Sequence, residues 1–182
     1  MGKKTFSQEE KSIESIWSWY EDQKEALRDF KNKIISSFKS LNPVIYDKFL
    51  TFTLNELNDY FNKSDEELEH LVCFDLISAT EALLRLDFHK KVHNKDKSEL
   101  GRIFRQIYKE KGDKFSLEKD IIEKWKVSIP NEKSKFSNFL GLLKYRHWLA
   151  HGRYWPPKFG RKFTPDVTYG IVDNILDIID NK

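Results

Sequence analysis

Apolar residues recur at helical spacing along most of this 182-residue chain. Over residues 13–38 they stand mainly three or four positions apart, which places them on one face of a helix. No segment shows a strand pattern of comparable strength. The chain has few helix breakers, with 7 Gly and 5 Pro, and it is rich in Lys, Glu, Leu and Ile. The sequence therefore predicts an all-α protein.

Capping residues and helix breakers divide the chain into separate helices. The polar runs 7–10 and 64–67 both have the form of a capping box, which opens a helix. Asn42-Pro43 and Gly152 are placed to end helices, and Thr164-Pro165 is placed to start one. In chain order the predicted helices cover about 7–39, 44–50, 53–62, 64–92, 98–109, a short segment after Ser116, 135–150, and the segment from Thr164.

These helices are predicted to form an up-and-down bundle. A chain of this length buries one core, so we expect a single helical domain over residues 1–182. The connections between the expected helices are short, as they are in such bundles. On this interpretation residues 1–62 form an N-terminal helical extension, and residues 63–182 form the core of the domain.

Several classes of protein are excluded by composition. The single cysteine, Cys73, lies in an apolar run and rules out an internal disulfide framework or a zinc site built from several thiolates. No apolar run is long enough to cross a membrane, and no apolar segment follows Lys3-Lys4 as a secretory signal would require. Glycine-rich nucleotide loops are also absent. We therefore expect a cytoplasmic protein with no membrane contact and no cofactor.

Basic residues are concentrated in one segment. Between Glu132 and Asp166 there is no other acidic residue, while eight basic and eight aromatic residues occur there. Cations neutralise phosphates and rings stack on exposed bases, so this segment is typical of a nucleic-acid surface. A solvated basic face whose aromatic residues form the core has the same composition, and the sequence favours neither alternative. The residues predicted to bind RNA on the first alternative are Lys144, Arg153, Trp155, Lys158, Arg161 and Lys162.

Arg146 and His151 are the residues in this segment best suited to chemistry. Five positions correspond to about 140° of rotation on an ideal helix, so the two side chains share a face only if the helix ends near His151 and that side chain turns back. Arginine binds phosphate through two hydrogen bonds, and histidine changes its charge near neutral pH. The pair therefore suits phosphodiester chemistry, with His151 moving a proton and Arg146 stabilising charge on the phosphate.

The segment containing Arg146 and His151 resembles the Arg-x4-6-His motif of the HEPN superfamily of helical ribonucleases. The position after the arginine is often polar in that family, and here it is His147. A second similarity lies on the predicted middle helix, where Glu81 and Arg85 match the Glu-x3-Arg pattern of several HEPN groups. In helix order the resemblance covers roughly residues 66–179, within the segment 63–182.

The resemblance implies a HEPN-like bundle that forms a homodimer, with the two motifs meeting at the interface. It also implies a metal-independent endoribonuclease in which His151 is the general acid or base and Arg146 holds the phosphate. His147, Glu81, Arg85 and Tyr154 are then supporting residues. Family members often act as toxins or in phage defence and are restrained by an antitoxin or regulatory protein. Several carry a modifiable Tyr two residues after the histidine, where this chain has Arg153.

Simpler interpretations of the same residues stay open. Arg146 also fits a surface cation paired with an acid of another helix, and His151 fits a helix cap. Glu81 and Arg85 also fit an ordinary ion pair within one helix. A HEPN-like bundle without activity, acting as an RNA- or protein-binding module, is a second alternative.

Paired histidines suggest a third alternative, a metal-dependent enzyme. His147 and His151 stand one helical turn apart, and so do His89 and His93. Spacing indicates no third ligand for either pair. The lysine-rich sequence around His89 also disfavours a bound cation. We therefore predict no metal among the site residues.

Overall fold

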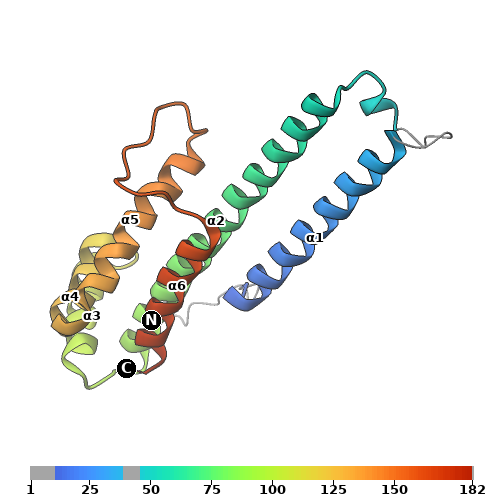
Figure 1. Ribbon diagram of the computed structural model, residues 1–182. Coiled ribbons are helices and arrows are strands. Elements are labelled where there is room, and N and C mark those ends of the chain that lie inside the picture. The colour runs from blue at the N-terminus through green and yellow to red at the C-terminus, as the bar shows by residue number, and fades with distance from the viewer. Residues whose placement is uncertain (1–10, 39–45, 182) are drawn as a thin grey trace. The chain divides into compact units, whose positions relative to one another are not determined.

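The computed structural model describes residues 11–38 and 46–181. Within these ranges the chain is helical and contains no strand, which confirms the predicted all-α class (Figure 1). The capping box expected at 7–10 lies outside the described residues. None of the helices that are described has both the length and the apolar character that crossing a membrane requires.

Six α-helices and three short helical turns make up the described chain (Figure 1). The α-helices are α1 (Ile13–Phe38), α2 (Leu54–His93), α3 (Glu99–Lys111), α4 (Glu123–Ser128), α5 (Lys133–Ala150) and α6 (Pro165–Asp180). The turns are η1 (Asp47–Phe49) and η3 (Pro130–Glu132), which are 3-10 helical, and η2 (Leu117–Ile122), which is π-helical.

The chain divides into two compact units. One unit is Glu14–Val72, and the described part of the other comprises residues 11–13 and 73–181. The change from one to the other falls between Val72 and Cys73, inside α2. The single domain over 1–182, with an extension ending at residue 62, stays a prediction.

The predicted break between helices at residues 62–64 is wrong. α2 runs unbroken from Leu54 to His93, and Ser64 does not cap a helix. The hydroxyl of Ser64 instead donates a hydrogen bond to the carbonyl oxygen of Tyr60, 2.9 Å away, as serine does inside helices. No proline or glycine interrupts the chain there, so nothing stops helical hydrogen bonding from continuing.

The capping box of α2 lies at Thr53 instead. The backbone N–H of Glu56 donates to Oγ1 of Thr53 at 3.3 Å, and the N–H of Thr53 donates to Oε2 of Glu56 at 2.8 Å. These reciprocal bonds satisfy two donors that the first turn of a helix leaves open. The predicted start near residue 53 is thereby confirmed.

Replacing Thr53 with alanine is expected to lower the free energy of unfolding by about 1 kcal/mol, because the first turn of α2 loses its side-chain acceptor. Ser64→Ala is the matched control, and it is expected to leave stability nearly unchanged because Ser64 lies within the helix. Urea unfolding followed by circular dichroism measures both. A larger loss in Ser64→Ala than in Thr53→Ala would show that the helix begins at Ser64.

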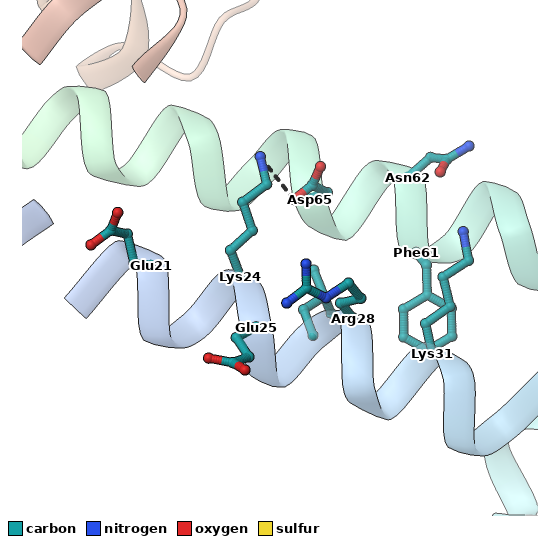
Figure 2. A pocket seen from close by; sticks show the side chains of 9 residues that line it. Glu21, Lys24, Glu25, Arg28, Lys31, Phe61, Asn62 and Asp65 are labelled. Atoms are coloured by element: carbon teal, nitrogen blue, oxygen red, sulfur yellow. Dashed lines mark ion pairs between the residues drawn. The ribbon is translucent and has the colours of Figure 1, made fainter. Parts of the chain in front are cut away.

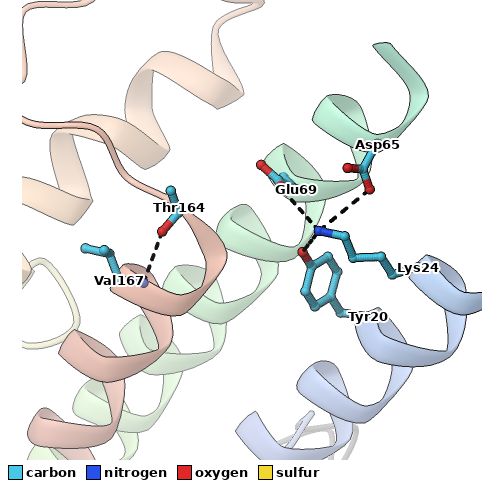
Figure 3. Close-up of polar contacts among 6 residues, drawn as sticks. All are labelled: Tyr20, Lys24, Asp65, Glu69, Thr164 and Val167. Atoms are coloured by element: carbon cyan, nitrogen blue, oxygen red, sulfur yellow. Dashed lines mark hydrogen bonds and ion pairs between the residues drawn. The ribbon is translucent and has the colours of Figure 1, made fainter. Parts of the chain in front are cut away.

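In the unit Glu14–Val72, α1 and the first part of α2 lie side by side around an apolar cluster. Its buried members are Ile34, Phe49, Leu57 and Phe61. Lys24 joins the two helices through its ammonium group, which lies 3.0 Å from the Tyr20 hydroxyl and 3.2 Å from Oε1 of Glu69 (Figure 3). The hydrogen bond with Tyr20 is the main cause that raises the pKa of Lys24, and burial raises the pKa of Tyr20.

The unit that contains Cys73 holds the larger core. α5 packs against α6 and α4, and α3 packs against α4. Trp125 is fully buried and stacks on Phe136 with ring centroids 5.9 Å apart. Cys73 is buried, as its apolar neighbours predict, and its sulfur accepts a hydrogen bond from the Thr168 hydroxyl at 3.4 Å. Thr164 caps α6 by accepting a hydrogen bond from the N–H of Val167, as predicted (Figure 3).

Candidate functional site

The motif helix ends where the sequence predicts. α5 closes at Ala150, and His151 is its C-cap residue. Gly152 follows with φ of 76°, a left-handed conformation that glycine adopts without strain. The N–H of Arg153 then donates to the carbonyl oxygen of Trp148 at 3.2 Å, which is the long bond of a Schellman motif. The backbone therefore leaves α5 sharply after His151.

Aromatic contacts hold the following loop against α5. Tyr145 stacks on Phe163 with centroids 5.1 Å apart and contacts Phe159 edge-on at 5.4 Å. The indole N–H of Trp148 donates to the carbonyl oxygen of Trp155 at 2.8 Å. The loop between α5 and α6 (Figure 1) is thus anchored by residues of the same segment that supplies the basic side chains.

Half of the eight aromatic residues of the basic segment belong to the core. Phe136, Phe139, Tyr145 and Phe163 are buried, so they do not offer faces to bases. Tyr154 differs, because 83% of its surface is exposed. For these four residues the structure decides between the two alternatives that composition left open, in favour of core packing.

A cleft of about 1000 Å³ lies between the second half of α2, the segment before and within η2, and the end of α5 with its loop. Its charged lining consists of four basic and two acidic side chains, which are Arg85, Lys144, Arg146, Lys158, Glu81 and Glu118. His147, Trp155 and Phe159 also line it. A cleft of this size and positive balance is suited to an anionic ligand.

The cleft gathers seven of the predicted site residues. They are Glu81, Arg85, Lys144, Arg146, His147, Trp155 and Lys158. Five other predicted site residues are not among the described side chains that line the cleft. They are His151, Arg153, Tyr154, Arg161 and Lys162. Arg161 instead lies over the ring of Phe163, with its guanidinium carbon 4.8 Å from the ring centroid.

Arg146 is fixed by two residues of α2. Its Nε lies 3.5 Å from Oε1 of Glu81, and its guanidinium carbon lies 5.4 Å from the centroid of Phe74. The predicted alternative of an ion pair with another helix is therefore confirmed. The ion pair of Glu81 in the described chain is with Arg146 and not with Arg85, the partner expected within one helix.

The Glu81 carboxyl group lies in a partly dry environment. Burial raises its pKa, and the charge of Glu118 adds to this effect, while Arg146 and Arg85 oppose it. Of the two opposing charges, that of Arg146 has the larger effect. Nε of Arg146 is itself buried, and the described residues provide it with no hydrogen-bond acceptor. The ion pair is thus a contact of charges without a hydrogen bond at Nε.

The two motif histidines lie against each other. Their ring centroids are 4.2 Å apart, and His147 contacts Trp155 at 6.2 Å. His147 lines the cleft, whereas His151 is not among its lining residues and contacts His147. No hydrogen bond connects His151 with Arg146 in the described region, and the turn of His151 back toward Arg146 stays a prediction. The residue predicted as a supporting group is therefore the histidine nearer the cleft.

Sequence reasoning missed Glu118 and the π-helical turn that carries it. Asp120 fixes this turn, because its carboxylate accepts hydrogen bonds from Nζ of Lys111 at 2.7 Å and from the N–H of Ser116 at 2.8 Å. Burial alone would raise the pKa of Asp120, but these bonds outweigh it and lower the pKa. Ser116 caps the turn as predicted, through the N–H of Lys119. The sequence carried no signal that this turn faces the end of α5.

The two histidine pairs are the groups that the sequence suggested as metal ligands. No cluster of three or more His, Cys, Asp or Glu side chains suited to a metal ion occurs in the residues that the structure describes. His89 and His93 stack with centroids 6.0 Å apart, and His89 is surrounded by the rings of Phe88, Tyr108 and Phe115. In the part of the chain that the structure describes, neither histidine pair has a third such side chain grouped with it.

A second cavity lies in the unit Glu14–Val72, between α1 and α2 (Figure 2). Its volume is about 520 Å³, and its charged lining is balanced, with the acids Glu21, Glu25 and Asp65 and the bases Lys24, Arg28 and Lys31. Lys24 is already paired with Asp65, 3.8 Å away. This cavity has no excess of positive charge, so the cleft beside α5 is the better site for a polyanion.

Comparison with protein-family models, with curated proteins and with solved structures gave no match for this chain. The function of the cleft is therefore inferred from its residues.

Proposed function

We propose that the protein is a metal-independent endoribonuclease whose HEPN-like core occupies residues 63–182. The observation that supports this most is the clustering of Arg146, His147, Lys144 and Lys158 around one cleft. RNA cleavage without a metal requires a permanent cation, a group able to move a proton, and further cations that bind phosphate.

In the proposed reaction the ribose 2′-oxygen attacks the adjacent phosphorus. A histidine accepts the proton of the 2′-hydroxyl, and the bond from phosphorus to the 5′-oxygen of the next nucleotide breaks. The protonated histidine gives this proton to the leaving 5′-oxygen, so the products carry a 2′,3′-cyclic phosphate and a 5′-hydroxyl. Arg146 neutralises the charge that builds on the phosphate oxygens.

Two assignments of the histidines are possible, and the assay below distinguishes them. The motif assigns proton transfer to His151, with His147 holding it at the cleft through their ring contact. The reverse assignment, with His147 acting directly, is favoured by its place in the cleft lining. Lys144, Lys158 and Arg85 bind flanking phosphates, and Trp155 provides a half-buried aromatic surface for a base.

The wider biology is proposed on the same resemblance. It comprises a homodimer with the two motifs at its interface, a toxin or phage-defence role in the cytoplasm, and restraint by an antitoxin or regulatory protein. The second candidate function is an inactive RNA- or protein-binding module. The ion pair of Arg146 with Glu81 favours that candidate, because it engages the charge that catalysis would need.

The proposal is tested by incubating the full chain with labelled single-stranded RNA in EDTA, beside the same sequence as DNA. We expect RNA to be cleaved with 2′,3′-cyclic phosphate ends and DNA to stay intact, because DNA lacks the attacking hydroxyl. His151→Ala and His147→Ala are compared in the same assay, and the residue that moves the proton is expected to lose about 10²–10⁴-fold in rate.

The outcomes separate the candidates. RNA that is bound but not cut by wild-type protein would favour the inactive module. Cleavage that requires added divalent metal would support the histidine pairs as metal ligands instead. Equal cleavage of DNA would exclude attack by the 2′-hydroxyl.

A further inference from the structure

Glu118 is an acidic side chain without an ionic partner in a cleft that otherwise favours anions. Four basic residues line the cleft, and its other acid, Glu81, is paired with Arg146. Glu118 is exposed and forms no ion pair within the described chain. It nevertheless faces the site closely enough for its charge to raise the pKa of Glu81.

The local fold does not need this carboxylate. Glu118 lies in the first turn of η2, where an acid often caps a helix. Other side chains already cap this turn. The Ser116 hydroxyl accepts a hydrogen bond from the N–H of Lys119, and the Asp120 carboxylate accepts one from the N–H of Ser116. The Glu118 side chain is therefore free for a contact outside η2.

A carboxylate in an RNA site repels phosphate, so it lowers affinity unless it accepts hydrogen bonds from a base. An ionised carboxylate only accepts, and its two oxygens match two adjacent donors. Guanine is the base whose Watson–Crick edge presents two such donors, N1–H and N2–H. Adenine and cytosine each offer one amino group beside an acceptor, and uracil offers one N–H between two carbonyls.

We propose that Glu118 recognises guanine in the bound RNA, with the aromatic surface of Trp155 in the same cleft available for stacking. This inference rests on the proposed ribonuclease function and adds the base preference of the same site. Lys144 and Lys158 then hold the backbone on either side without reading sequence.

The test uses uridine-tract RNAs that differ at one position, which is guanosine, inosine, adenosine or cytidine. We expect kcat/KM for cleavage next to guanosine to exceed that next to adenosine or cytidine by roughly 5- to 100-fold, the range for a bidentate base contact. Inosine lacks the N2 amino group, so its kcat/KM is expected to lie between that for guanosine and that for adenosine or cytidine. Glu118→Gln is expected to abolish the preference while the other RNAs are still cleaved. Glu110→Gln, an exposed acid of α3 that does not line the cleft, is the matched control and is expected to keep it.

Two results would overturn the inference and leave the ribonuclease function standing. One is equal cleavage at all four bases by wild-type protein. The other is a Glu118→Gln variant that cleaves every RNA faster with an unchanged order of bases, which would show only that a repelling charge was removed. Absence of cleavage for every RNA would instead overturn the proposed function, and with it this inference.

Discussion

Replacing Arg146 with alanine is expected to reduce kcat for RNA cleavage by about 10²–10³-fold, the usual cost of removing one group that stabilises transition-state charge. The reason is the position of Arg146 in the cleft, where Glu81 and Phe74 both contact its guanidinium group. Single-turnover cleavage at saturating protein measures the chemical step, and fluorescence anisotropy measures RNA binding separately.

Two controls distinguish a loss of catalysis from a loss of folding. Arg146→Ala leaves the half-buried Glu81 carboxylate without its partner, which costs stability by itself. The variant is therefore also made with Glu81→Gln, and urea unfolding is recorded for each protein. Arg161→Ala removes the same charge from the same segment but outside the cleft, and it is expected to retain nearly full kcat. Equal losses in Arg146→Ala and Arg161→Ala would exclude a catalytic role for Arg146.

Trp125→Ala is expected to lower the free energy of unfolding by about 3–5 kcal/mol, the largest stability effect that we predict for a single substitution. The side chain is 1% exposed, stacks on Phe136, and fills the space where α4 meets α5. Its removal is expected to leave a cavity, because the surrounding structure relaxes only partially after such a substitution. Urea unfolding followed by far-ultraviolet circular dichroism gives the change directly.

Val127 on the same helix provides the contrast. It is 70% exposed, so Val127→Ala is expected to change stability by no more than about 0.5 kcal/mol. Trp125→Phe is expected to lose less than Trp125→Ala, because it keeps a ring against Phe136 and removes a buried N–H that has no hydrogen-bond partner among the described residues. Similar midpoints for Trp125→Ala and Val127→Ala would show that α4 does not contribute to the core.

Local sequence determined the helices and most of their ends. The cap at Thr164, the cap at Ser116 and the glycine stop at Gly152 all occur where predicted. These features depend on hydrogen bonds and backbone conformations spanning a few residues, so a short stretch of sequence specifies them. The wrong prediction of a helix start at Ser64 shows the limit of such signals. Inside a helix a serine hydroxyl also finds a hydrogen-bond partner, here the carbonyl oxygen of Tyr60.

The sequence also identified many of the residues that line the cleft, because charge and chemical type were visible in it. What it did not determine was which side chains meet. Three features depend on the packing between α2, η2 and α5. Arg146 contacts Glu81, His147 lines the cleft while His151 does not, and Glu118 lines the same cleft. These pairs are separated by many residues or by a helix end. Only the tertiary structure decides them, because the side chains meet through the burial of their helices and not through their own attraction.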